Sequence, residues 1–306
     1  MRRRGTEPAP AIYNRSTDGG LSMKVLIATD GSKYGKWATE WAARMPFADR
    51  PQFTLVHVTD VEALRAPFMF QPVVIGNEPF IQEEIKRIEA RGKATMAAAK
   101  AQMASLDMKG KLVSERGPVG RTILKLAPRR DGLVALGSRG LDALDRFMLG
   151  SVSTQVTLHA PCSVLIVKEA SRPLSRILFA TDGSKASDKA LQFLLTKLRP
   201  ETGDGREPME VVVTHVMPFL KYPELKAAGS SLIEQCANKL GKAGYVVDEV
   251  VRLGKPADEI LKVASKKKVD LIVTGAKGLG AVARFLLGSI STKVVQHSAC
   301  SVLVVR

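Results

Sequence analysis

Two stretches of the sequence repeat the same spacing of glycine and serine. Residues 137–151 read GSRGLDALDRFMLGS and residues 275–289 read GAKGLGAVARFLLGS, so both fit Gly-x2-Gly-x9-Gly-Ser. Because glycine has no side chain, a backbone that contains it can approach an anionic group closely and offer its N–H groups. The pattern predicts two phosphate-binding loops, with these fixed positions: Gly137, Gly140, Gly150 and Ser151, then Gly275, Gly278, Gly288 and Ser289.

A carboxylate accompanies each loop. Thr-Asp-Gly-Ser follows an apolar run in both halves of the chain and contains Asp30 in the first half and Asp182 in the second. A carboxylate suits the hydroxyl groups of a ribose, so acid and glycine loop together predict a nucleotide site. The same four residues also form a common turn and helix N-cap, and this interpretation stays open.

Further residues of the loops have expected roles of their own. Arg139 and Lys277 lie between the first two glycines and are candidates for phosphate contact. Each closing Gly-Ser precedes a predicted helix, whose N-terminal N–H groups favour an anion. The spacers that begin at Leu141 and Leu279 are predicted to form short amphipathic helices that pack on the domain.

The whole sequence is duplicated, which sets the domain organisation. KVLIATDGS at 24–32 returns as RILFATDGS at 176–184, and HAPCSVLIVK at 159–168 returns as HSACSVLVVR at 297–306. We expect two tandem domains, 23–169 and 174–306, joined by the short polar linker EASRPLS. The polar residues 1–22 are expected to form a disordered tail, with Met23 as an alternative native start.

Each half alternates apolar runs with helical stretches. The expected strands are apolar without polar alternation, which is typical of a parallel sheet buried on both faces: 24–29, 53–58, 111–116, 133–137 and 163–167, then 176–181, 210–216, 246–252, 270–275 and 301–305. The expected helices are 33–45, 80–106, 121–126, 185–198, 223–242 and 258–266. This predicts an α/β fold of two doubly wound domains, each with a five-stranded parallel sheet in the order 3-2-1-4-5.

The predicted strand order brings the motifs together. Ligands of open α/β sheets bind at the carboxyl ends of strands where the strand order reverses, which here is between the first and fourth strands. Asp30 ends the first strand and Gly137 ends the fourth; Asp182 and Gly275 do so in the second half. We therefore expect one site per domain.

Composition narrows the class of protein. The formal net charge is +16, but basic residues are spread over both halves and aromatic residues make up 5%, so nucleic acid is not expected as a partner. The sequence contains no apolar run of the length of a membrane span. Its three cysteines do not suggest a disulfide framework, so we expect a cytoplasmic protein.

The motifs together resemble the universal stress protein family, in its ATP-binding branch. The resemblance rests on Thr-Asp-Gly-Ser, the glycine loop and the His-Ala-Pro-Cys-Ser-Val-Leu ending, and it covers nearly all of 23–306 as two fused copies. It implies a Rossmann-like fold of the adenine nucleotide alpha hydrolase type that binds ATP, with Mg²⁺ carried by the phosphates. Family members commonly have proline two residues before the aspartate, where this sequence has Ala28 and Ala180.

The resemblance also implies roles for individual residues. Asp30 and Asp182 would bind the ribose or base, and Val58 and Val216 would flank the adenine. The phosphates would be held by Gly137, Gly140, Gly150 and Ser151, by Gly275, Gly278, Gly288 and Ser289, and by the further hydroxyls of Ser153 and Ser291.

Catalysis is less clearly indicated. The four histidines, His57, His159, His215 and His297, form two repeat-equivalent pairs, and none stands in a recognisable triad or metal site. Three hypotheses stay open: a nucleotide-dependent regulatory protein of the stress response, a slow ATPase or autophosphorylating enzyme, and a structural or interaction module.

The last strand of each half is a candidate sheet edge. Both strands are apolar, so we expect them to need cover. The resemblance implies pairing of the two domains through these strands as an internal pseudo-dimer, further homodimerisation, and a regulatory protein partner.

Overall fold

The computed structural model describes residues 22–61, 78–129, 131–141, 149–200, 208–217, 223–277 and 287–306. The predicted tail up to residue 21, most of the insertion after the second strand, and Gly278 lie outside the described residues. The apolar spacers after Leu141 and Gly278 do so as well, up to residues 148 and 286.

Strands and helices alternate along both halves. In the first half they are β1 (Lys24–Ala28), α1 (Lys33–Arg44), β2 (Gln52–Thr59), α3 (Glu78–Ser105), β3 (Gly110–Arg116), α4 (Val119–Leu126), β4 (Leu133–Gly137), α5 (Ser151–His159) and β5 (Ser163–Val167). In the second they are β6 (Arg176–Ala180), α6 (Lys185–Lys197), β7 (Glu210–Met217), α7 (Pro223–Lys242), β8 (Val246–Leu253), α8 (Pro256–Lys267), β9 (Leu271–Gly275), α9 (Ser289–His297) and β10 (Ser301–Val305).

Two predicted helices begin earlier than expected because of proline. Helix α4 begins at Val119 instead of Arg121, with Pro118 as its N-cap, and α8 begins at Pro256 instead of Asp258. Proline lacks an N–H but is already set to a helical φ, so it starts a helix at little cost.

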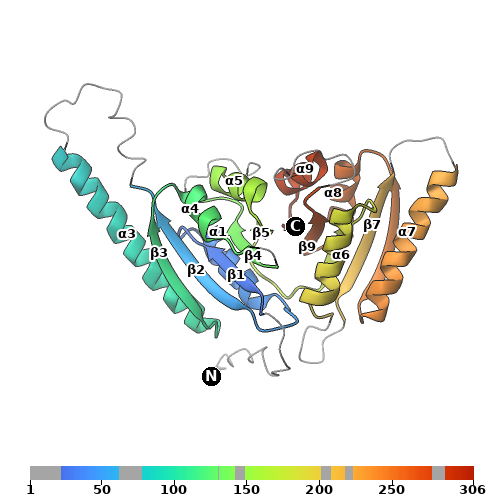
Figure 1. Ribbon diagram of the computed structural model, residues 1–306, viewed down its shortest axis with the longest axis horizontal. Coiled ribbons are helices and arrows are strands. Elements are labelled where there is room, and N and C mark those ends of the chain that lie inside the picture. The colour runs from blue at the N-terminus through green and yellow to red at the C-terminus, as the bar shows by residue number, and fades with distance from the viewer. Residues whose placement is uncertain are drawn as a thin grey trace, which may run out of the picture.

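The strands form one sheet of ten strands, in the order β3-β2-β1-β4-β5-β10-β9-β6-β7-β8. Within each half all pairs are parallel and the order is 3-2-1-4-5, which confirms the predicted fold class. Strands β5 and β10 pair antiparallel, with Leu165 opposite Leu303, so each covers the apolar edge of the other half. Figure 1 shows the two halves side by side, with α3 and α7 at the outer ends.

Both faces of the sheet are buried by helices. Neighbouring residues of β1 alternate between two hydrophobic layers, since Ile27 packs on one face and Leu26 on the other. The first layer includes side chains of α1, α3, α6 and α7, and the second includes side chains of α4, α5, α8 and α9. Each layer continues from one half into the other, as expected for strands that are apolar throughout.

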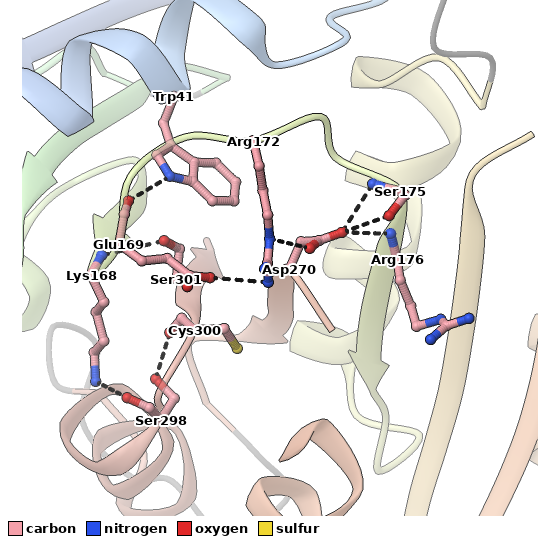
Figure 2. Close-up of polar contacts among 10 residues, drawn as sticks. All are labelled: Trp41, Lys168, Glu169, Arg172, Ser175, Arg176, Asp270, Ser298, Cys300 and Ser301. Carbon is pink, nitrogen blue, oxygen red and sulfur yellow. Dashed lines mark hydrogen bonds and ion pairs between the residues drawn. The ribbon is translucent and has the colours of Figure 1, made fainter. Parts of the chain in front are cut away.

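The linker, residues 169–175, crosses the junction of the two halves without forming a helix or strand (Figure 2). Trp41 of α1 donates from Nε1 to the carbonyl of Glu169 at 3.0 Å, and Arg172 Nε lies 2.7 Å from Asp270 Oδ1. Leu174 is buried in the first hydrophobic layer. The linker is therefore bound along its length by both halves.

Two cations hold the helix ends across the junction. Lys168, directly after β5, donates to the carbonyls of Gln296 and Ser298 at the end of α9, at 3.2 and 2.7 Å. Arg306, directly after β10, donates to the carbonyls of Thr157 and Leu158 at the end of α5. A cation at a helix C-terminus is stabilised by the free carbonyls and by the helix dipole.

The three cysteines are free and buried. Burial raises the pKa of the Cys162 and Cys300 thiols to about 12, so both stay protonated at neutral pH. Among the residues that the structure describes, no helix has the length and apolar character needed to cross a membrane.

Candidate functional site

A cavity of about 380 Å³ opens at the carboxyl ends of β1 and β4. Strand β1 lies between β2 and β4, so this is the point where the strand order reverses. The cavity is lined by every residue that the sequence analysis assigned to the first site: Ala28, Asp30, Val58, Gly137, Arg139, Gly140, Gly150, Ser151 and Ser153. Apolar side chains complete it, among them Val56, Val119, Ile123 and Leu136.

Asp30 joins the first turn to the glycine loop. Its Oδ1 accepts the N–H of Ser32 at 3.0 Å, and its Oδ2 accepts the N–H of Leu141 at 3.1 Å. Gly31, which lies between Asp30 and Ser32 in the chain, has a φ of 82°, a conformation that favours glycine. The carboxylate is thereby fixed in the cavity wall.

The alternative interpretation of Thr-Asp-Gly-Ser as a turn and N-cap is also correct. The Oγ atoms of Ser32 and Ser184 accept the N–H groups of Gly35 and Ser187, which caps α1 and α6. Asp182 Oδ1 accepts the N–H of Ser184 at 3.0 Å, as in the first half. One short motif thus begins the helix and places the acid at the strand end.

The glycines of the loop have different neighbours. A Cβ on Gly137 would lie 2.5 Å from Tyr34 Cβ, and one on Gly275 would lie 2.5 Å from the carbonyl carbon of Ala186. These two glycines therefore allow the first turn of α1 or α6 to pack against the strand end. A Cβ on Gly140 would instead lie 2.7 Å from Asp30 Oδ2, so Gly140 lets the loop close over the carboxylate.

Helix α5 begins at the cavity, with Gly150 as its N-cap. A Cβ added to Gly150 would lie no closer than 3.5 Å to any other atom, so the surrounding protein does not by itself require glycine there. Glycine has no side chain to cap the helix, which leaves the first N–H groups of α5 to an outside acceptor. Gly288 occupies the same N-cap position of α9.

Ser153 and Ser291 are used within the fold. Both are buried, and their hydroxyls donate to the carbonyls of Gly137 and Gly275 at 2.7 and 2.8 Å. Each bond ties a helix to the end of a strand. Because a hydroxyl has one proton, this geometry leaves none to donate to a phosphate. Ser151 and Ser289, in contrast, are exposed.

Arg139 gives the cavity a positive wall. Its Nη1 donates to the Tyr34 hydroxyl at 2.9 Å, and its guanidinium lies 5.5 Å from the centre of the Tyr34 ring. Lys33 Nζ lies 5.1 Å from the same ring centre. An aromatic ring attracts cations to its face, so Tyr34 positions positive charge at this rim.

Leu141 does not pack as the amphipathic spacer predicted. Its side chain is 70% exposed, because its backbone N–H is held by Asp30 and the residue stands in a turn at the rim. The interpretation of this position as core-facing is wrong.

The histidines of the second strands have a role that sequence reasoning missed. His57 Nδ1 lies 2.9 Å from the carbonyl of Thr29, and His215 Nδ1 lies 2.9 Å from that of Thr181. A carbonyl only accepts, so Nδ1 carries the proton in both rings. The bonds join the end of β2 or β7 to the start of the Thr-Asp-Gly-Ser turn. Their repeat equivalence in the sequence was the available signal.

The second half repeats the arrangement as far as it is described. Ala180 ends β6 and Asp182 follows it, and Val216 lies in β7. Gly275 ends β9 and Lys277 comes two residues later, while Gly288, Ser289 and Ser291 lie at the N-terminus of α9. Ser184 Oγ donates to the Lys277 carbonyl at 3.4 Å, which links the turn to the loop. In the described ranges, no three His, Cys, Asp or Glu side chains gather in a way that could hold a metal.

Known proteins match the chain in both halves. The protein-family model for the universal stress protein family matches residues 22–168 and 173–306. A universal stress protein of Bacillus subtilis is 33% identical over 148 residues, which are 43% of this chain and 99% of that protein. A universal stress protein of Mycobacterium tuberculosis is 26% identical over 299 residues, 92% of this chain and 96% of that protein.

A solved structure supports the fold over both halves. The crystal structure of a universal stress protein from Archaeoglobus fulgidus aligns with a TM-score of 0.65 and 21% identity, and it covers 92% of this chain and 98% of that one. Family match and fold agree with the duplicated sequence. The chain belongs to the universal stress protein family and carries two copies of its domain in tandem.

Proposed function

We propose that the protein binds ATP at the carboxyl ends of β1 and β4, and at the equivalent ends of β6 and β9. It acts as a regulatory module of the stress response, in which the nucleotide state biases contact with a protein partner. The observation that carries the proposal is the cavity of about 380 Å³, which gathers all nine predicted residues of the first half around one opening. Such a volume suits a small ligand.

The lining offers three kinds of contact, one for each part of a nucleotide. Asp30 presents a fixed carboxylate to ribose hydroxyls. Ala28, Val58 and Ile123 provide an apolar wall for a base. At the other end, Arg139 and the first N–H groups of α5 provide positive charge and donors for phosphates.

The same lining favours holding ATP over rapid hydrolysis. Asp30 is the only acidic residue among the described residues that line the cavity. Both of its oxygens already accept backbone N–H groups. General base catalysis requires a base within reach of the group that attacks the phosphate, whereas Asp30 is assigned here to the ribose end of the ligand. Mg²⁺ would enter with the phosphates, and its charge would screen them in the site.

Titration calorimetry with Mg-ATP tests the proposal on the wild type and on Gly140→Ala. The added methyl group would lie 2.7 Å from Asp30 Oδ2, so we expect loss of about tenfold or more in ATP affinity at the first site, with binding retained in the second half. The matched control is Gly241→Ala in α7, where a Cβ would meet nothing within 4 Å.

The control should bind ATP as the wild type does. Absence of binding to the wild type at millimolar Mg-ATP would contradict the proposal. Asp30→Ala combined with Asp182→Ala should abolish binding in both halves, and ATP should then no longer raise the melting temperature.

A further inference from the structure

The antiparallel pairing of β5 with β10 gives the junction two equivalent sides. One side holds the linker and is called here the linker groove. It is formed by Trp41, Arg44, Lys168, Asp270, Ser298 and Ser301. The other is called the open groove, a cavity of about 640 Å³. Its lining includes the repeat equivalents of five of these six residues: Phe193, Thr196, Arg306, Ala160 and Ser163. The sixth, Asp270, corresponds to Gly132, so the open groove lacks that carboxylate at the equivalent position.

The linker groove shows what this shape of groove can hold. The Trp41 indole and the Arg44 guanidinium donate to two nearby carbonyls of the linker, those of Glu169 and Ser171, at 3.0 and 3.5 Å. Asp270 then binds Arg172 and the backbone N–H of Ser175 (Figure 2). A peptide without regular structure is therefore bound by its backbone and by one charged side chain.

The open groove differs in its charge. Lys189 and Lys197 of α6 line it together with Lys277 and Arg306, whereas the described part of its lining contains one acidic side chain, Asp131. Among the ion pairs of the described residues, none involves these three lysines. In the described parts of the chain the four cations of the groove thus outnumber its one carboxylate, and none of the three lysines is held in a close ion pair.

Arg306 adds a donor without an acceptor. Its Nη2 is used by the carbonyls at the end of α5, but its Nε is buried and has no hydrogen-bond partner among the described residues. A buried guanidinium donor left without a partner costs free energy, and this donor lies inside the protein, so what Arg306 contributes to the lining of the open groove is its positive charge. On the other side of the junction the equivalent residue, Lys168, directly precedes the linker and donates to the Ser298 carbonyl.

We propose that the open groove binds an extended, acidic segment of a partner protein. The equivalent groove, filled by the linker, argues for a peptide as the occupant, and the four cations argue for acidic side chains on it. Phe193 stands where Trp41 donates to the linker, so the open groove lacks that indole N–H and depends more on its charges. Electrostatic complementarity of this kind supplies association rate and partner choice.

Fluorescence anisotropy with a labelled peptide tests this on the full chain. The probe is Glu-Ala-Ser-Glu-Pro-Leu-Ser-Glu, the sequence of residues 169–176 with glutamate at both arginine positions. We expect saturable binding that weakens as the salt concentration rises from roughly 50 to 300 mM, because the contacts are charge pairs at a surface. The unchanged sequence of residues 169–176, with both arginines, should bind at least about tenfold more weakly.

Charge reversal in the groove locates the binding. The double substitution Lys189→Glu with Lys197→Glu should lower the affinity for the acidic probe by about tenfold or more. The matched control, Lys239→Glu with Lys242→Glu on exposed positions of α7, changes net charge equally and should leave affinity within about twofold. Circular dichroism and melting temperature confirm that both variants are folded.

Several outcomes would overturn the proposal. One is the absence of saturable binding of the acidic probe to the wild type. Another is a loss of affinity in the α7 variant equal to that in the groove variant, because it would mean that the probe is attracted to the overall positive charge of the protein. Unlabelled tripolyphosphate is the third test. If it binds at Lys189 and Lys197 while the peptide does not, the open groove is a site for small anions and not for a protein segment.

Discussion

The residues of one glycine motif divide between the fold and the cavity. Gly137 makes room for Tyr34 at the first turn of α1, and Ser153 ties α5 to the end of β4. Gly140, Gly150 and Ser151 instead face the opening beside Asp30. The spacing of the motif therefore reflects two requirements, the packing of the fold and the lining of the cavity. Only the lining of the cavity bears on a ligand.

The hydroxyl of Ser153 allows these two demands to be separated. Ser153→Ala removes the bond to the Gly137 carbonyl and leaves a buried acceptor unpaired, so we expect the free energy of unfolding to fall by about 1–2 kcal/mol. ATP affinity should change less than about threefold, because the hydroxyl proton is already used within the fold. Urea unfolding and titration calorimetry on the same preparation measure both quantities. A large loss of ATP affinity with unchanged stability would show that this hydroxyl contacts the phosphates.

At the scale of elements, the start of β6 depends on one buried carboxylate. Asp270, just before β9, accepts the N–H groups of Ser175 and Arg176 at 3.0 and 2.9 Å on one oxygen and binds Arg172 with the other. Its side chain is 6% exposed. Asp270 thereby fixes where the linker ends and the first strand of the second half begins.

Replacement of this carboxylate should be costly. Asp270→Asn turns an acceptor into an amide donor beside Arg172 or the two N–H groups, and we expect a loss of about 2–3 kcal/mol in the free energy of unfolding. The control is Asp258→Asn, whose partner Lys293 is 46% exposed, so water screens this ion pair and the substitution should change the unfolding free energy much less than Asp270→Asn does. Urea unfolding monitored by circular dichroism compares the two. Equal effects of both substitutions would mean that Asp270 does not organise the junction.

At the scale of the whole molecule, the two halves share one sheet and two hydrophobic layers. Lys168 and Arg306 each extend from one half onto a helix of the other. Burial lowers the pKa of Lys168 from 10.5 to about 8, because the charged ammonium has lost water at the junction. The junction should therefore respond to pH.

The direction follows from proton binding. Between about pH 8 and 10.5 the unfolded chain keeps the Lys168 proton while the folded chain releases it, so this residue's contribution to stability rises with pH. Cys162 and Cys300 act oppositely above pH 9, so wild type must be compared with Lys168→Met. From pH 7 to 9.5, the difference in unfolding free energy should shift by up to about 2 kcal/mol in favour of the wild type. A shift of the other sign, or none, would contradict the assigned burial.

Much of this molecule was predictable from local sequence. Continuous apolar strands predicted burial on both faces, and the alternation of strands with helices predicted the strand order that places Asp30 opposite Gly140. These signals are readable because strand burial, helix caps and tight turns depend on residues close together in the chain. The helix starts at Pro118 and Pro256 were missed by only one turn or less, since helix ends depend on capping geometry.

What the sequence determined by itself is the family, the fold of each half and the residues around the cavity of the first half. The tertiary structure decided which of those residues serve packing: Gly137 meets Tyr34, and the proton of Ser153 goes to a carbonyl. It also decided that a single linker fills one side of the junction and leaves the side of Lys189 and Lys197 open. These features depend on contacts between residues far apart in the chain. The two sides of the junction would be equivalent by the repeat, but they differ because the two halves are joined by only one linker, which occupies one side.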